Sequence, residues 1–239
     1  KPNDELLDQA TETPKEDVVQ PKIPTPKVEE EKLEVHFIDV GYGDAILFKK
    51  NKDTLLVDCG RSDEPIFNYL SKLKISDVDL LIATIPLKEH VGGCDRVLRN
   101  LVVHQAMDNG RSPHDEAFEE YLKYRGESRY NVLKKGEKLS LGDIKITVLG
   151  ANNRIEKENS NPVILKVSYG DIDFLLSSDC NEECESKLPL GMQSEIFKVS
   201  NYGSLLSNSY EFISKVSPEV SIISISADNQ YKNPKQPLL

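Results

Sequence analysis

The chain has 239 residues, a formal net charge of −10 and a pI of about 5.0. This length suits one domain of ordinary to large size, or two small ones. The acidic balance argues against a general nucleic-acid binder, because contacts with phosphates require clustered Lys and Arg side chains, although it leaves a local basic patch open. No apolar run approaches the roughly 18 residues that a membrane-spanning helix needs.

The first 33 residues differ in composition from the rest. They lack aromatic side chains and are rich in charged residues and in proline, at Pro2, Pro14, Pro21, Pro24 and Pro26. Such a segment buries too little apolar surface to offset the entropy lost on ordering. We therefore predict a disordered tail or linker over residues 1–33 and one domain over residues 34–239. A stalk between an upstream membrane anchor and this domain is the sharper alternative.

From residue 33 onward, short apolar segments and helical patterns alternate. "LEVHFIDV", "AILFKK" and "TLLVDCG" predict three strands, with a turn at residues 51–53. "EPIFNYLSKLK" has its apolar residues at helical spacing and predicts a helix. Two more strands are predicted at "DLLIATI" and "LVVHQAM", and a helix at "HDEAFEEYLKY".

The second half repeats this style. Strands are predicted at "KITVLG", "PVILKVSYG", "IDFLLSSD", "EIFKVS" and "EVSIISIS", and helices over residues 181–188 and near residues 210–216. Strands in clusters with helices between them favour sheets covered by helices over a simple doubly wound order.

Several predicted strands end in an aspartate that small residues follow. These aspartates are Asp39, Asp44, Asp58 and Asp179. Loops at the carboxyl ends of strands carry the chemistry of many α/β-type folds. One such aspartate is more often a turn or cap residue. Several in one chain, together with the "HVGG" loop, favour a shared site.

Seven blocks of sequence, taken in order, carry a resemblance to a known family. They are "HFIDVGYGDAILF", "LLVDCG", "DLLIATIPLKEHVGG", "ILKVSYGDIDFLLSSD", "IFKVSNYGS", "PEVSIIS" and "NQYKNP". Their order and spacing resemble the metallo-beta-lactamase-like (MBL-fold) hydrolase domain at the C-terminal end of competence DNA-uptake channels of the ComEC type. The resemblance implies an α+β fold, a four-layer αββα sandwich, over residues 34–239. Because that family usually continues further, a domain truncated at its C-terminal end is expected.

Typical members of the family use two zinc or manganese ions to generate hydroxide for phosphodiester cleavage. In the first ligand loop, Ile85 and Leu87 stand where the family has a His and an Asp, and Glu89 stands where it has a second Asp. Four positions of that loop match the family, namely Thr84, His90, Gly92 and Gly93.

In the other blocks too, residues that shape the loops match the family, whereas most of the metal-binding residues do not. Asp179, after Ser177 and Ser178, matches the family's bridging aspartate. The His-His-Gly-Ser block is replaced by Asn201, Tyr202, Gly203 and Ser204, which removes both imidazoles. Two other blocks change as well: Asn233 stands in place of a His near Asn229, Tyr231 and Pro234, and Tyr42 stands in place of a Gln.

The surviving candidate metal ligands are His90, Glu89, Asp179 and Asp58. A catalytic zinc needs about three protein ligands and an open position, and a metal pair needs more. We therefore expect no cofactor, and a degenerate domain that serves as a binding or structural module. The alternative is a phosphodiesterase or nuclease-like hydrolase with a single Zn or Mn ion, in which Asp179 and Glu89 are the catalytic carboxylates.

The four cysteines leave three interpretations open. Cys59, Cys94 and Cys180 each follow a candidate site loop, and Cys184 lies four residues beyond Cys180. They are buried small apolar side chains, or disulfides of an extracytoplasmic protein paired as Cys59–Cys94 or Cys180–Cys184, or a replacement thiolate metal site with His90 and Asp179.

The resemblance places further residues around the ancestral site. They are Asp39, Asp44, Gly92, Gly93, Asn201, Tyr202, Asn233, Cys59, Cys94 and Cys180. We expect an extracytoplasmic, secreted or lipoprotein-like location. The partner stays unknown at this stage, with no strong nucleic-acid signature in the chain.

Overall fold

The computed structural model describes residues 32–110, 116–126, 129–151 and 162–234. These residues belong to one unit that spans Glu31–Leu239. The tail predicted over residues 1–33 lies almost wholly outside the described residues and stays a prediction.

The first half of the unit forms a six-stranded sheet in chain order, β1 to β6. Pairing is antiparallel from β1 to β3 and parallel from β3 to β6. The strands are β1 (Glu34–Phe37), β2 (Ile46–Lys50), β3 (Asp53–Val57), β4 (Asp77–Ile82), β5 (Val102–Asp108) and β6 (Tyr130–Val132), and the helices are α1 (Asp63–Lys72), α2 (Lys88–Val91), α3 (Cys94–Asn100) and α4 (Glu116–Arg125).

The second half forms another six-stranded sheet, also with neighbours in chain order. Pairing is antiparallel from β7 to β10 and parallel from β10 to β12. The strands are β7 (Lys138–Leu141), β8 (Ile144–Gly150), β9 (Ile164–Tyr169), β10 (Ile172–Leu176), β11 (Ile196–Lys198) and β12 (Val220–Ile222), and the helices are α5 (Glu182–Glu185), η1 (Ser200–Gly203) and α6 (Tyr210–Val216).

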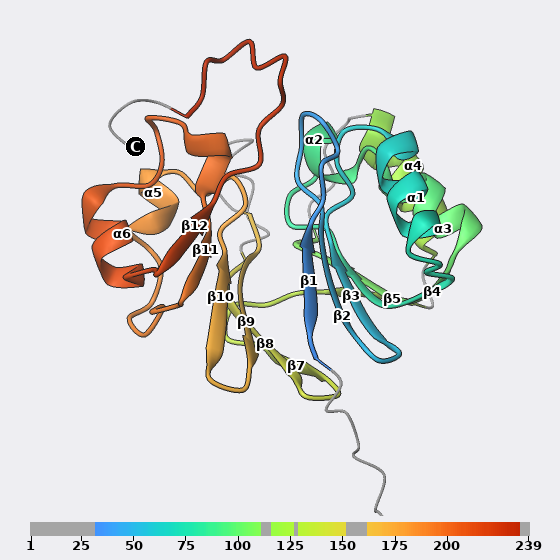
Figure 1. The fold of residues 1–239 in the computed structure, drawn as a ribbon, viewed down its shortest axis with the longest axis horizontal. Helices are drawn as coiled ribbons and strands as arrows, with labels where there is room; N and C mark the ends of the chain where they lie inside the picture. Colours follow the sequence, from blue (N-terminus) through green and yellow to red (C-terminus); the bar gives the residue numbers. More distant parts are fainter. Residues whose placement is uncertain (1–31, 111–115, 127–128, 152–161, 235–239) are drawn as a thin grey trace, which may run out of the picture. The chain divides into compact units, whose positions relative to one another are not determined.

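Alternating side chains of the strands build three apolar layers. In β2, Phe48 packs between the two sheets, whereas Leu47 packs beneath α1, α3 and α4. On the far side of the second sheet, Phe197 packs against Phe212 of α6. Strands buried on both faces are apolar almost throughout, as the sequence of β3 and β4 is. The result is the predicted α+β sandwich of four layers, αββα (Figure 1).

The helices largely follow the predictions. Helix α1 has acidic residues in its first turn and Lys72 in its last, which suits the helix dipole, and it buries Ile66 and Leu70. The helix predicted over residues 181–188 is shorter, because α5 ends at Glu185 and the chain continues in tighter turns ahead of Pro189. No helix within the described residues is both long and apolar enough to cross a membrane.

Phe48→Ala tests the packing between the sheets. Phe48 is fully buried and its ring meets that of Phe174 edge to face, with centroids 5.2 Å apart. We expect a loss of about 3–5 kcal/mol in the free energy of unfolding, measured by urea denaturation. Ile172→Ala is the control, because Ile172 is 42% exposed on the same sheet as Phe174. Equal losses for the two variants would contradict this packing.

Candidate functional site

The carboxyl ends of parallel strands bring the candidate residues together. Asp58 follows β3 and Thr84 follows β4 in the first sheet, and Ser178 follows β10 in the second. The hydroxyl oxygens of Thr84 and Ser178 lie 2.7 Å apart, so the two sheets are in polar contact at this edge. The structure therefore brings the segments that follow β3, β4 and β10 together at one edge.

The buried carboxylate of Asp58 is fully engaged. Its Oδ1 accepts the backbone N–H of Thr84 at 2.7 Å, and its Oδ2 accepts the Thr84 hydroxyl at 2.6 Å and the Nδ1–H of His90 at 2.7 Å. The Thr84 hydroxyl donates its one hydrogen to Asp58, so in its contact with Ser178 it is the acceptor and the Ser178 hydroxyl is the donor. Burial raises the pKa of Asp58, against the influence of His90 and Thr84. Asp58 therefore orients the imidazole of His90.

His90 lies between two carboxylates and is completely buried. Its Nε2 is 3.4 Å from Oδ1 of Asp179 and 3.3 Å from the hydroxyl of Tyr202. Burial alone would lower the pKa of His90, but Asp179 and Asp58 raise it well above its ordinary value. This shift favours the imidazolium form of His90. The 3.4 Å contact is long for a hydrogen bond, which leaves Asp179 Oδ1 without a good donor.

A second buried cation joins the sheets. The ammonium of Lys198, at the end of β11, lies 2.8 and 3.0 Å from the carboxylate oxygens of Asp44, which precedes β2. It also donates to the carbonyl of Val199 at 3.3 Å. Burial would raise the pKa of Asp44, but Lys198 and His90 lower it overall.

Sequence reasoning missed Lys198. The available signal was one lysine inside the apolar strand "EIFKVS". A lysine is almost never fully buried without a partner, so a cation at that position predicts a buried carboxylate opposite it.

Tyrosines cover the imidazole of His90. Tyr202 is buried, and its ring stacks on that of Tyr42 with centroids 5.0 Å apart. The ring centroid of Tyr231 lies 5.7 Å from that of Tyr42. Burial raises the pKa of Tyr202 well above its ordinary value and that of Tyr42 to about 12, so both phenols are neutral near pH 7. Tyr202, at a position where the family has an imidazole ligand, therefore contributes an aromatic ring that contacts His90.

The backbone of the site is held in uncommon conformations. Asp58, Ser178, Asn201 and Tyr202 all have left-handed φ values, of 60°, 48°, 48° and 53°. Residues other than glycine seldom adopt this region, and bulky ones rarely do. Surrounding bonds maintain it, such as that from the Asn201 N–H to the Ser178 carbonyl at 2.9 Å. The loops keep a demanding geometry although most of the expected ligands are absent from the sequence.

The glycines of the site loops allow backbone to touch backbone. A Cβ at Gly92 would lie 2.1 Å from the carbonyl oxygen of Arg61, and one at Gly43 would lie 2.4 Å from that of Glu89. A Cβ at Gly93 would meet the carbonyl oxygen of Cys59 at 2.5 Å. These glycines therefore serve the packing of one loop on another.

All four cysteines are paired. The disulfides join Cys59 with Cys94 and Cys180 with Cys184, the pairs considered from the sequence. The interpretation as a thiolate metal site is therefore wrong, because a disulfide sulfur lacks the thiolate that binds a metal.

The other predicted site residues are placed less centrally. The side chain of Glu89 lies 3.6 Å from Arg61, whereas its backbone carbonyl accepts the Asp44 N–H. Asp39 is exposed and accepts the N–H of Gly41, as a turn residue does. Two asparagines make local bonds: the Asn201 amide donates to the Ser207 hydroxyl, and the Asn233 carbonyl accepts the Asn229 amide.

These residues do not fit the metal pair that the resemblance implies. Asp58 is engaged with Thr84 and His90, and Asp44 with Lys198. Two adjacent groups are left as metal ligands, Nε2 of His90 and the carboxylate of Asp179. Within residues 32–234 as described, no group of three or more His, Cys, Asp or Glu side chains is arranged to hold an ion. Catalytic zinc takes about three protein ligands.

Solved structures share this architecture. The metallo-beta-lactamase fold protein YhfI from Bacillus subtilis superimposes with a TM-score of 0.55 at 14% identity, over 85% of this chain and 91% of that one. The chain has the metallo-beta-lactamase fold. CmlA beta-hydroxylase (an E377D mutant) also superimposes with a TM-score of 0.55, at 13% identity, over 85% of this chain and 47% of that one.

Sequence relatives of this metallo-beta-lactamase-fold chain are longer proteins. It is 26% identical to ComE operon protein 3 of Bacillus subtilis, over 86% of this chain and 30% of that protein. It is 26% identical to Recombination protein 2 of Haemophilus influenzae, over 84% of this chain and 25% of that protein. The chain thus spans less than a third of either relative. No protein-family profile matches it.

Lys198→Met tests the buried ion pair of the metallo-beta-lactamase-fold domain. The change leaves the Asp44 carboxylate buried without its cation, and we expect a loss of about 3–5 kcal/mol in the free energy of unfolding, measured by urea denaturation. The double variant Lys198→Met/Asp44→Leu removes both charges, so it should regain much of the loss. Strictly additive losses in the double variant would contradict a direct pairing.

The raised pKa of His90 predicts a pH dependence. The imidazolium stabilises the fold fully below the unfolded value of about 6.5, and this contribution is lost as the pH rises through the higher folded value. The free energy of unfolding should therefore fall between pH 6.5 and 9, with a slope of up to about 1.4 kcal/mol per pH unit. His90→Gln should flatten this slope. Wild-type stability that rises over the same range would refute the assignment.

Proposed function

We propose that this domain is a non-hydrolytic form of the metallo-beta-lactamase fold, which acts as a binding or structural module of a competence-related protein. One observation carries the proposal: the buried side chains of Lys198 and His90 are paired with the carboxylates of Asp44 and Asp58 at the strand ends. Asp44 and Asp58 are each engaged by partners at 3.0 Å or less. An incoming metal ion would have to displace these buried partners, which costs the pairing energy of both ions.

Side-chain volume supports the same proposal. Ile85 is fully buried where the family pattern expects an imidazole ligand, and an alkyl side chain coordinates no metal. Tyr202 fills another such position and contacts Nε2 of His90, the nitrogen a metal would need. A remodelled hydrolase would have to move this ring before substrate or metal could reach the imidazole.

A single-metal hydrolase is the second candidate, and one observation favours it. Asp179 Oδ1 is buried without a good hydrogen-bond donor, 3.4 Å from Nε2 of His90. A Zn or Mn ion between these two atoms would satisfy the oxygen. Two donors make a weak site, however, and Glu89 is directed toward Arg61.

The disulfides support an extracytoplasmic location for the module. Structural disulfides persist in oxidising compartments and are rare in the cytosol. Cys59–Cys94 and Cys180–Cys184 each lie beside a loop that carries a site residue, Asp58 or Asp179. In an oxidising compartment these bonds would secure the loops without a metal.

Metal binding separates the two candidates. We expect elemental analysis of the purified protein to find no stoichiometric Zn or Mn, and we expect neither ion to raise the melting temperature. A ligand at 100 times its Kd would add about 2.7 kcal/mol of stability, which a melting curve detects readily.

Asp179→Ala and Asp39→Ala form the matched pair for this experiment. One stoichiometric ion that is lost in Asp179→Ala but kept in Asp39→Ala, together with cleavage of bis(p-nitrophenyl) phosphate, would establish the hydrolase and refute the non-hydrolytic proposal. Asp39 suits the control because it is exposed and makes only a turn contact.

A further inference from the structure

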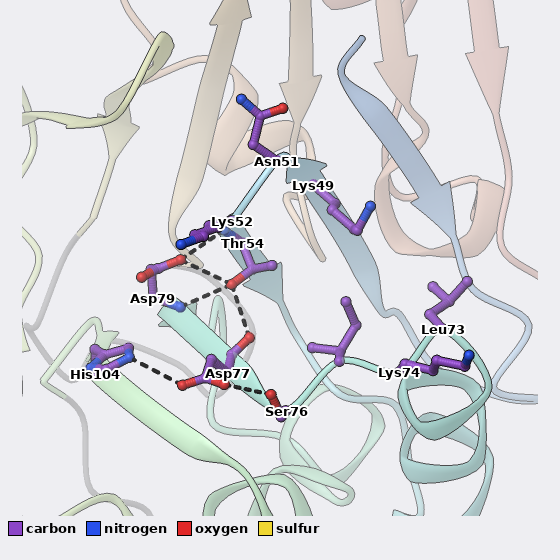
Figure 2. Close-up of a pocket in the computed structure, with 11 residues that line it drawn as sticks. Lys49, Asn51, Lys52, Thr54, Leu73, Lys74, Ser76, Asp77, Asp79 and His104 are labelled. Carbon is purple, nitrogen blue, oxygen red and sulfur yellow. Dashed lines mark hydrogen bonds and ion pairs between the residues drawn. The ribbon is translucent and has the colours of Figure 1, made fainter. Parts of the chain in front are cut away.

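A pocket of about 540 Å³ lies at the other end of the first sheet. It is lined at the amino ends of β3 and β4, whereas Asp58 and Thr84 lie beyond their carboxyl ends. Figure 2 shows polar side chains around its rim. Its volume falls in the range of small-molecule sites, about 300–1,000 Å³.

Nitrogen-bearing side chains reach this pocket from four separate elements (Figure 2). Lys49 comes from β2, Lys52 from the turn between β2 and β3, Lys74 from the loop after α1, and His104 from β5. Residues distant in sequence thus bring three lysines and one histidine to the lining of one concave surface. The positive charge of the lysines attracts anions to this surface.

Two of these lysines are available for a ligand. Lys52 and Lys74 are exposed, and within the described residues neither has an ion-pair partner. Lys49 is paired with Glu34 at 3.4 Å, a contact at the surface that is easily exchanged. The chain has a net charge of −10, so two lysines without an ion-pair partner at one pocket depart from its generally acidic character.

The carboxylates of the pocket already have partners. Asp79 accepts the backbone N–H of Thr54 at 2.9 Å, and the Thr54 hydroxyl lies 3.1 Å from the same oxygen. Asp77 accepts the Ser76 hydroxyl at 2.5 Å and lies 3.7 Å from His104. These contacts join β3, β4 and β5 at the pocket wall and hold the two carboxylates there.

Backbone geometry and apolar contacts point to the same surface. Lys74 has a φ of 57° directly after the C-cap of α1, a position where glycine is usual. A lysine there holds its backbone in a strained conformation, and backbone strain is common among residues of functional sites. Leu73 and Ile75 on either side of it add apolar lining.

We propose that this pocket binds a small phosphate-bearing molecule. The lysines hold the phosphate, and Leu73 and Ile75 contact its organic part. A concave pocket, rather than an extended basic stripe, favours a small ligand over a nucleic-acid strand. The site is separate from the cross-sheet site, so it does not depend on the function proposed above.

The test is an NMR titration of the ¹⁵N-labelled protein with phenyl phosphate at 0.15 M ionic strength. We expect saturable shifts confined to the amides of residues 49–54, 73–77 and 104. Lys52→Gln/Lys74→Gln should weaken binding about tenfold or more, because each removes a charged contact with the phosphate.

A charge-matched variant and a neutral ligand complete the test. Lys138→Gln/Lys145→Gln removes two exposed lysines of the second sheet and should bind as the wild type does. Benzyl alcohol, which lacks the phosphate, should give no saturable shifts. Equal weakening in the two double variants, or shifts scattered over surface lysines, would overturn the proposal, as would the absence of saturation.

Discussion

The pairing of buried charges across the two sheets is the interaction on which the rest of the site depends. Lys198 and Asp44 come from opposite sheets and would each be costly to bury alone. Together with the contact between Thr84 and Ser178, they fix the strand ends of one sheet against those of the other. Groups of the protein itself therefore pair the carboxylates Asp44 and Asp58 at this edge.

The sequence was sufficient for the fold and for the frame of the site. The strand pattern predicted sheets covered by helices, and the resemblance carried by the order of the blocks implied four layers with a site at one edge. The four-layer sandwich is as the resemblance implied. Strand periodicity is a local property, so it survives the loss of the ligands. Turn residues such as Asp39 could not be told from site residues, because both are aspartates after a strand.

The roles of Lys198 and Glu89 could not be predicted, for a physical reason. The lysine inside an apolar strand signals a buried cation, but its partner is a carboxylate 154 positions away in the chain, which no local pattern identifies. Glu89 occupies a ligand position in the sequence, yet its side chain lies near Arg61 on a neighbouring loop. The pocket around Lys74 was missed similarly, because strands β2 to β5 and two loops line it, and only the folded sheet brings them together.

The two sheets have similar plans, antiparallel strands first and parallel strands after. Each half contributes one partner to the Thr84–Ser178, Asp44–Lys198 and His90–Asp179 contacts. Each half by itself therefore holds charged groups whose partners lie in the other half. Asp44 lacks its counter-ion without the second half, and His90 lacks Asp179. In evolution these positions should be replaced together, partner with partner, so that substitutions in one half should correlate with substitutions in the other.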